Sequence, residues 1–221
     1  MNQSLIRTMS EQVVTRIRDR ILTGAYAPGS PLLQDVIAAE FGVSKIPVRE
    51  ALVQLRADGL VDIFTHRGFQ VRSLSTTELE EVFRLRLAIE PQAVAHGSQI
   101  ADSEDRERSA SALTDLNEAL EHQDLSHSGE LNCRFHLTLI VPRLQPVSNE
   151  VLYRLHTLAQ RYVRLHLLPA GRSARAIREH GALHAAWIAG RAREVRALAK
   201  AHIEETRREL SSYLSAHKDA T

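Results

Sequence analysis

The sequence predicts a mainly α-helical protein in two parts: three helices and a β-hairpin over residues 1–73, and a bundle of six helices over residues 74–221. Three observations support this prediction. Apolar residues recur every three or four positions along most of the chain, which is typical of helices with one buried face. Alternating apolar residues, typical of strands, are confined to residues 61–71. The chain has 221 residues, of which 43% are hydrophobic, so it can bury a core without disulfides.

The first part contains three short helical patterns, each followed by a glycine. Ser44 is expected to cap the third helix, since its hydroxyl can accept a hydrogen bond from the first turn. The patterns cover residues 13–22, 33–41 and 45–58, and the glycines lie at positions 24, 42 and 59.

Two alternating runs, Val61–Phe64 and Phe69–Val71, follow the third helix and are separated by four residues. This spacing predicts a small β-hairpin. The second and third helices are joined by Gly42-Val43-Ser44, a connection typical of a helix-turn-helix. Three helices followed by a hairpin, the wing, make a winged helix-turn-helix.

The second part, from about Ser75, shows helical patterns and no convincing strand. Thr76 is expected to cap its first helix, and Pro91 is expected either to kink that helix or to lie at a bend. No fixed period of self-similarity occurs, which favours a compact bundle over a repeat array. The expected helices are residues 76–96, 103–122, 126–140, 148–168, 175–189 and 192–215, with breaks at Pro142, Pro146 and 169–171.

The overall charge is nearly balanced, with 28 Lys+Arg against 27 Asp+Glu. The first 73 residues carry nine Lys+Arg and seven Asp+Glu (9 − 7 = +2), which leaves −1 for the rest. Only a local pattern can therefore indicate a nucleic-acid partner. The single cysteine, Cys133, excludes an internal disulfide and a thiolate zinc site, and it is interpreted as a small buried hydrophobe. No apolar run is long enough to cross a bilayer, so we expect a cytoplasmic protein with no membrane contact.

The third helix has the pattern of a DNA-reading helix. Lys45 and Arg49 are four residues apart and project from one face, with Ser44 and Pro47 in the same first turn. At the tip of the wing, His66, Arg67 and Gly68 form a short basic arm suited to phosphates or a minor groove. A Lys/Arg pair alone more often marks a helix face that is merely exposed to solvent. Together with the spacing of the turn and the wing, however, the pair favours operator DNA as the partner.

This part closely resembles the GntR family of bacterial transcription regulators. The resemblance lies in residues 24–29, in the run from Phe41 to Leu52, in Asp58-Gly59-Leu60-Val61 and in residues 67–71. It implies DNA binding by a homodimer that reads two half-sites. The family usually has arginine where this chain has Lys45. A lysine cannot make the bidentate contact of an arginine, so we expect Lys45 to bind phosphate rather than a base.

The second part resembles the FCD domain of the FadR subfamily, in the shorter VanR-like branch. The resemblance rests on Asn132 and His136 in one helical turn, followed by His180 and His202. It implies that these residues hold a divalent metal such as zinc or nickel. Asn132 replaces the usual aspartate, so metal affinity should fall. His184, four residues after His180, is an alternative ligand.

Arg86 and Glu90 also match the family, in the first helix of the bundle. The resemblance implies that Arg86 binds the carboxylate of a small metabolite; a buried salt bridge to Glu90 is an equal alternative. We therefore expect a DNA-binding regulator, a repressor in the family's common case, that senses a small carboxylate. A regulator with a purely structural metal is the alternative. A metal-dependent hydrolase is remote, because the His180–His184 pair lacks the glutamate of H-E-x-x-H.

Overall fold

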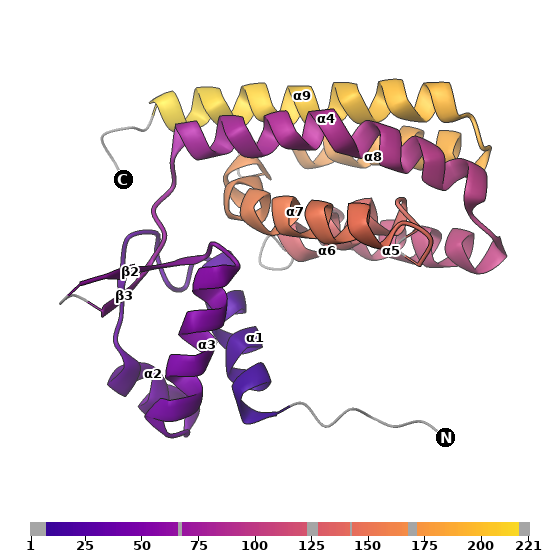
Figure 1. Cartoon of the computed structure of the whole chain (residues 1–221). Helices are drawn as coiled ribbons and strands as arrows, with labels where there is room; N and C mark the ends of the chain where they lie inside the picture. Colours follow the sequence, from indigo (N-terminus) through magenta and orange to yellow (C-terminus); the bar gives the residue numbers. More distant parts are fainter. Residues whose placement is uncertain (1–7, 66–67, 123–127, 142, 168–171, 217–221) are drawn as a thin grey trace, which may run out of the picture. The chain divides into compact units, whose positions relative to one another are not determined.

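The structure is a computed structural model that describes residues 8–65, 68–122, 128–141, 143–167 and 172–216. The chain forms two compact units, the first ending at Leu74 and the second beginning at Ser75. Figure 1 identifies the elements of each unit, and each unit is described by itself.

The first unit has the predicted three helices and hairpin. Thr8 caps the first helix with a reciprocal pair of hydrogen bonds to Glu11. Gly42 ends the second helix with φ +68°, a backbone angle that favours glycine. The elements are α1 (Met9–Leu22), β1 (Pro31–Leu32), α2 (Gln34–Phe41), α3 (Lys45–Ala57), β2 (Val61–Phe64) and β3 (Gly68–Val71).

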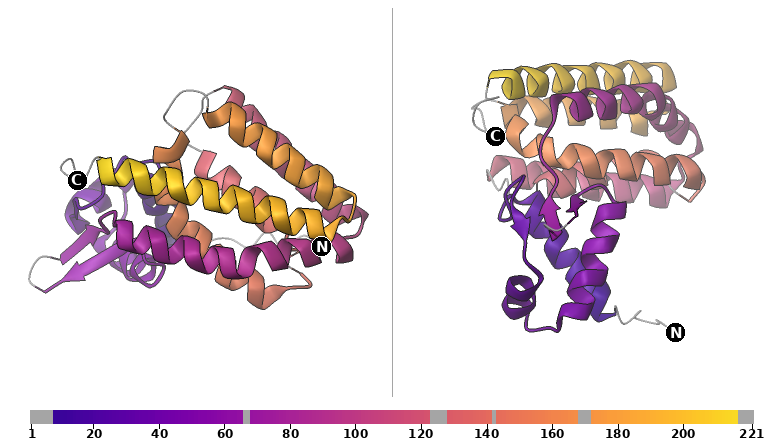
Figure 2. Two further views of the ribbon diagram at one scale, coloured as in Figure 1. Left: turned by 90° about the horizontal axis from the view of Figure 1, so that it is seen from above. Right: turned by 60° about the vertical axis from the view of Figure 1, so that its left-hand side comes forward.

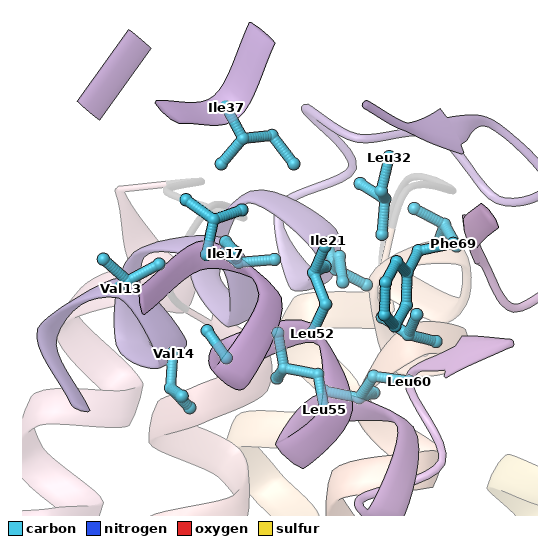
Figure 3. Close-up of a cluster of buried hydrophobic side chains, with 14 of the residues drawn as sticks. Val13, Val14, Ile17, Ile21, Leu32, Ile37, Leu52, Leu55, Leu60 and Phe69 are labelled. Carbon is cyan, nitrogen blue, oxygen red and sulfur yellow. The ribbon is translucent and has the colours of Figure 1, made fainter. Parts of the chain in front are cut away.

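The wing is a three-stranded antiparallel sheet in the order β1-β3-β2, one strand more than the hairpin predicted. The added strand is only two residues long, with Pro31 opposite Gln70 and Leu32 opposite Phe69. Buried side chains from all three helices and from the sheet form one hydrophobic cluster (Figure 3). This core fixes which face of α3 is buried.

The second unit contains six helices among the described residues. α4 and α9 lie side by side along their length in the views of Figures 1 and 2 and make the most extensive contact of the bundle. α6 contacts α5 and α7, and α8 contacts α5 and α9. The helices are α4 (Thr76–Ile100), α5 (Ser103–Glu121), α6 (Ser128–Thr138), α7 (Pro146–Leu167), α8 (Arg172–Ile188) and α9 (Ala192–Ala216).

Several helix ends differ from the sequence prediction. The cap of α4 is Ser75 rather than Thr76, because the Ser75 hydroxyl accepts from the Glu78 N–H. Pro91 lies inside an α4 that continues to Ile100. Pro146 is the first residue of α7 rather than a break, a position where the missing N–H costs nothing. Pro142 and residues 169–171 lie outside the described residues.

Candidate functional site

The predicted DNA-reading helix presents its polar residues to solvent. Ser44, Lys45 and Arg49 are exposed and Pro47 is half-buried, while Val48 is fully buried in the core of the unit. Ser44 occupies the N-cap position of α3, but its side chain makes no capping hydrogen bond, contrary to expectation. Its hydroxyl is therefore not engaged by the helix.

The two basic residues of α3 differ in their pairing. Lys45 Nζ lies 2.5 Å from Asp35 Oδ1, in a pair that is largely exposed. Arg49 forms no ion pair with any residue that the structure describes. Its guanidinium is available to a phosphate or to the edge of a guanine, whereas Lys45 must first leave Asp35.

Only one of the three predicted wing residues can be placed. Gly68 begins β3 with φ +76°, a conformation that strains any residue with a side chain. His66 and Arg67 lie outside the described residues.

The bundle brings together three of the predicted metal-binding residues. His136 comes from α6, His180 from α8 and His202 from α9, and each offers a ring nitrogen within 4.8 Å of the other two. We call these residues the histidine group. The Nε2 atoms of His180 and His202 are 3.3 Å apart. Two nitrogens bound to one tetrahedral zinc, each at 2.0–2.1 Å, would lie about 3.3 Å apart. The spacing therefore fits a shared metal ion.

Two carboxylates orient the rings of the histidine group. Glu90 Oε1 lies 3.0 Å from His136 Nδ1, and Glu179 Oε2 lies 2.7 Å from His202 Nδ1. In metal sites, a histidine commonly donates its second N–H to a carboxylate, which turns the other nitrogen toward the metal. Both contacts have this arrangement.

The electrostatics of His136 also suit a ligand. Burial lowers its pKa to about 3 despite the opposing effect of Glu90. The ring is therefore neutral at pH 7, with a lone pair on one nitrogen. Its Nε2 atom is buried and has no hydrogen-bond partner among the described residues. An unsatisfied buried nitrogen is costly in a core, and a metal ion would satisfy it.

Asn132 and His184 lie beside the histidine group in the sequence but differ from it in placement. Asn132 is half-buried on α6, one turn before His136. His184 is outside the group: its Nε2 lies 3.0 Å from the Ser109 hydroxyl on α5. That contact gives His184 a structural partner and favours His180 as the ligand from α8.

Arg86 forms the buried salt bridge that the sequence left as an alternative. Its Nε and Nη2 donate to the two oxygens of Glu90 at 2.9 and 3.3 Å, and both side chains are at most 3% exposed. Burial alone would raise the pKa of Glu90, but Arg86, His156 and His136 hold it well below its ordinary range. Glu90 is therefore an ionised carboxylate that joins Arg86 to the histidine group through His136.

Sequence reasoning missed His156. This residue is buried on α7, and its Nε2 lies 3.2 Å from Glu90 Oε2. Glu90, His136 and His156 also lie within the spacing of a metal site. Arg86 already neutralises Glu90, however, which favours an ion-pair network there. The sequence does contain a signal for its burial: His156 comes four residues after Leu152, which places it on the apolar face of α7.

Two further features bear on access and reactivity. His202 lines a groove along α8 and α9. The lining also contains basic and acidic side chains, among them Arg178, Lys200, Arg208, Glu204 and Glu205. Cys133 on α6 is buried and unpaired, as predicted, and burial raises the pKa of its thiol to about 11.

In the described part of the chain, no helix combines the length and the apolar character needed to cross a membrane.

Known families match both units. Residues 9–71 match the bacterial regulatory proteins of the gntR family, and residues 81–205 match the FCD domain. The winged unit with its exposed basic helix and the helical bundle thus define a DNA-binding transcriptional regulator rather than an enzyme. The chain belongs to the GntR family, with an FCD domain as its second unit.

Relatives agree with this assignment. An uncharacterized HTH-type transcriptional regulator from the TAR-I ttuE-ttuC' intergenic region of Agrobacterium vitis is 34% identical over 128 residues, which cover 56% of this chain and 74% of the relative. McbR of Escherichia coli is 27% identical over 148 residues, 67% of each chain.

Solved structures share the fold. The structure of Escherichia coli McbR/YncC has a TM-score of 0.80 at 23% identity and covers 94% of this chain and 99% of its own. A GntR regulator from Rhodococcus has a TM-score of 0.76 at 24% identity and covers 91% of this chain and 96% of its own.

Proposed function

We propose that this regulator is a homodimeric repressor whose bundle senses a small carboxylate metabolite through a divalent metal held by His136, His180 and His202. The observation that carries the proposal is the convergence of three histidines from three helices, two of them oriented by carboxylates. Operator DNA would be bound by Ser44, Lys45, Pro47 and Arg49, together with His66, Arg67 and Gly68 of the wing.

The donor set favours zinc or nickel. Imidazole suits both metals, and the group contains no thiolate. Asn132 would be a fourth ligand, since an amide oxygen can coordinate without adding charge. When bound, the ion would supply a Lewis-acidic centre, and a carboxylate oxygen could bind to it by expanding the coordination beyond these four ligands.

Arg86 would contribute a second contact to the carboxylate. It donates to Glu90 through Nε and Nη2, so its remaining N–H groups can bind an anion, or an effector can displace Glu90. Either event would change the environment of Glu90 and hence of His136.

Helix α4 would link the sensor to the DNA-binding unit. It carries Arg86 and Glu90, and only residues 72–75 separate its start from β3. The Tyr162 hydroxyl bonds to both Ser75 and Glu78, which ties the beginning of α4 to α7. A carboxylate that binds two arrangements of α4 with different affinity would shift their populations, and it would change operator affinity by at most the ratio of its two affinities.

Two assays on one preparation test the proposal. Operator affinity is measured with and without zinc and a set of small carboxylic acids, and thermal unfolding is measured in parallel. We expect one acid to weaken operator binding only when metal is present. His180→Ala should abolish this response, and His184→Ala, a matched change one turn along α8, should retain it.

The alternative, a purely structural metal, predicts another result. Zinc would then raise the unfolding temperature, while no acid would change operator affinity in any metal state. That outcome would refute the sensing proposal and leave DNA binding intact. Sedimentation of the free protein tests the dimer, and a monomer at micromolar concentration would contradict it.

A further inference from the structure

The solvent-facing side of α3 is centred on an apolar residue. Ile46 is 71% exposed, and Val53, two turns later, is 49% exposed. Both lie on α3, the helix proposed above to bind operator DNA, and the inference rests on that proposed function. Among the described residues of the first unit, Ile46 is the most exposed large apolar side chain.

The direction of each side chain follows from the helical repeat of 100° per residue. The buried residues of α3 are Val48, Ala51, Leu52 and Leu55. Ile46 projects within about 10° of the direction opposite to their mean, whereas Arg49 is about 70° and Lys45 about 110° away from it. The side chain aimed most directly away from the core is therefore Ile46, and the two cations lie toward one edge.

This arrangement suits a major groove. The residues at the start of such a helix reach base edges, and cations at its edge reach phosphates or guanines. An isoleucine can neither donate nor accept a hydrogen bond. The apolar group that an unmodified base pair presents in the major groove is the 5-methyl of thymine.

We infer that Ile46 is a specificity-determining residue that packs against the methyl group of one thymine in each operator half-site. Arg49 supplies the adjacent polar contact and Lys45 the phosphate contact. The side chain selects thymine over cytosine, since cytosine has no methyl group at this position.

The test removes one methyl group at a time. A preferred duplex is selected from a random library with the full-length protein, and each thymine is then replaced singly by deoxyuridine, which lacks only the methyl. Binding is measured by fluorescence anisotropy. We expect one thymine per half-site at which replacement weakens wild-type binding about fourfold, the effect of burying one methyl group.

Ile46→Ala should lose this sensitivity at that thymine. Val36→Ala is the matched control, because Val36 is a similarly exposed residue, 58%, on α2; it should keep the full fourfold effect. Equal unfolding temperatures for the three proteins exclude misfolding.

Two results would overturn the assignment: no single replacement weakens wild-type binding by more than 1.5-fold, or the same replacement weakens wild type and Ile46→Ala equally. Both are distinguishable from a failure of DNA binding, because the selected duplex would still be bound tightly by the wild type.

Discussion

Replacing Arg86 by methionine should destabilise the bundle strongly. The guanidinium is 3% exposed and holds a carboxylate that is 1% exposed, at 2.9 and 3.3 Å. Removing one partner of such a pair leaves a buried charge, which typically costs about 3–5 kcal/mol. His136 and His156 still contact Glu90 in the variant, so we expect the lower end, about 3 kcal/mol.

The assay is urea unfolding followed by tryptophan fluorescence. The chain has a single tryptophan, Trp187, which is fully buried in the bundle and donates to the Leu139 carbonyl. The signal therefore reports the unit that contains the pair. Arg84→Met, an exposed change on the same helix, is the control and should shift the free energy of unfolding by about 0.5 kcal/mol or less.

The double variant Arg86→Met/Glu90→Gln should be more stable than Arg86→Met alone, because it removes the orphaned charge. Two results would refute this account of the pair. The free energy of unfolding of Arg86→Met could fall by less than about 1 kcal/mol, or the decrease in the double variant could equal the sum of the decreases in Arg86→Met and Glu90→Gln.

Four other predictions follow from the two units. Arg49→Ala should weaken operator binding by about 1–3 kcal/mol with an unchanged unfolding temperature; undiminished operator affinity would contradict the role of α3. His136→Ala should lower the metal content of the purified protein in elemental analysis, and an unchanged metal-to-protein ratio would exclude it as a ligand. Asn132→Asp should tighten metal binding in a chelator competition, since it restores a charge; equal or weaker affinity would disprove the proposed effect of Asn132. Gly97→Ala should cost about 3 kcal/mol in urea unfolding, because a Cβ there collides with the Leu139 carbonyl; a loss below about 1 kcal/mol would mean that this backbone shifts easily.

Local patterns predicted most of the fold. Helix periodicity located the helices, and the alternation around Val61 and Phe69 located the hairpin. β1 was not predicted, because a strand of two residues shows no alternation of apolar and polar positions. Pro31 and Leu32 form a strand only through pairing with β3. The choice between Ser75 and Thr76 as a cap depends on one hydrogen bond, which adjacent hydroxyl residues do not distinguish in sequence.

The bundle site was predictable only in part. His136, His180 and His202 were found by resemblance, and the structure places their ring nitrogens within 4.8 Å of one another. His156 was missed because its role depends on α7 packing against α4, a contact between distant segments. The pairing of Arg86 with Glu90 was one of two open alternatives, and only the packed geometry shows that they are in contact.

The buried thiol of Cys133 has a practical consequence. Alkylating reagents attack the thiolate, and a group with a pKa of about 11 has almost none at neutral pH. Because the chain contains no other cysteine, a single cysteine introduced at an exposed position would be the one reactive thiol of the protein. Fluorophores or spin labels could then be attached site-specifically without first removing a native residue, and the distance between labels on the two copies of the proposed dimer would report directly how each ligand changes the separation of its DNA-binding units.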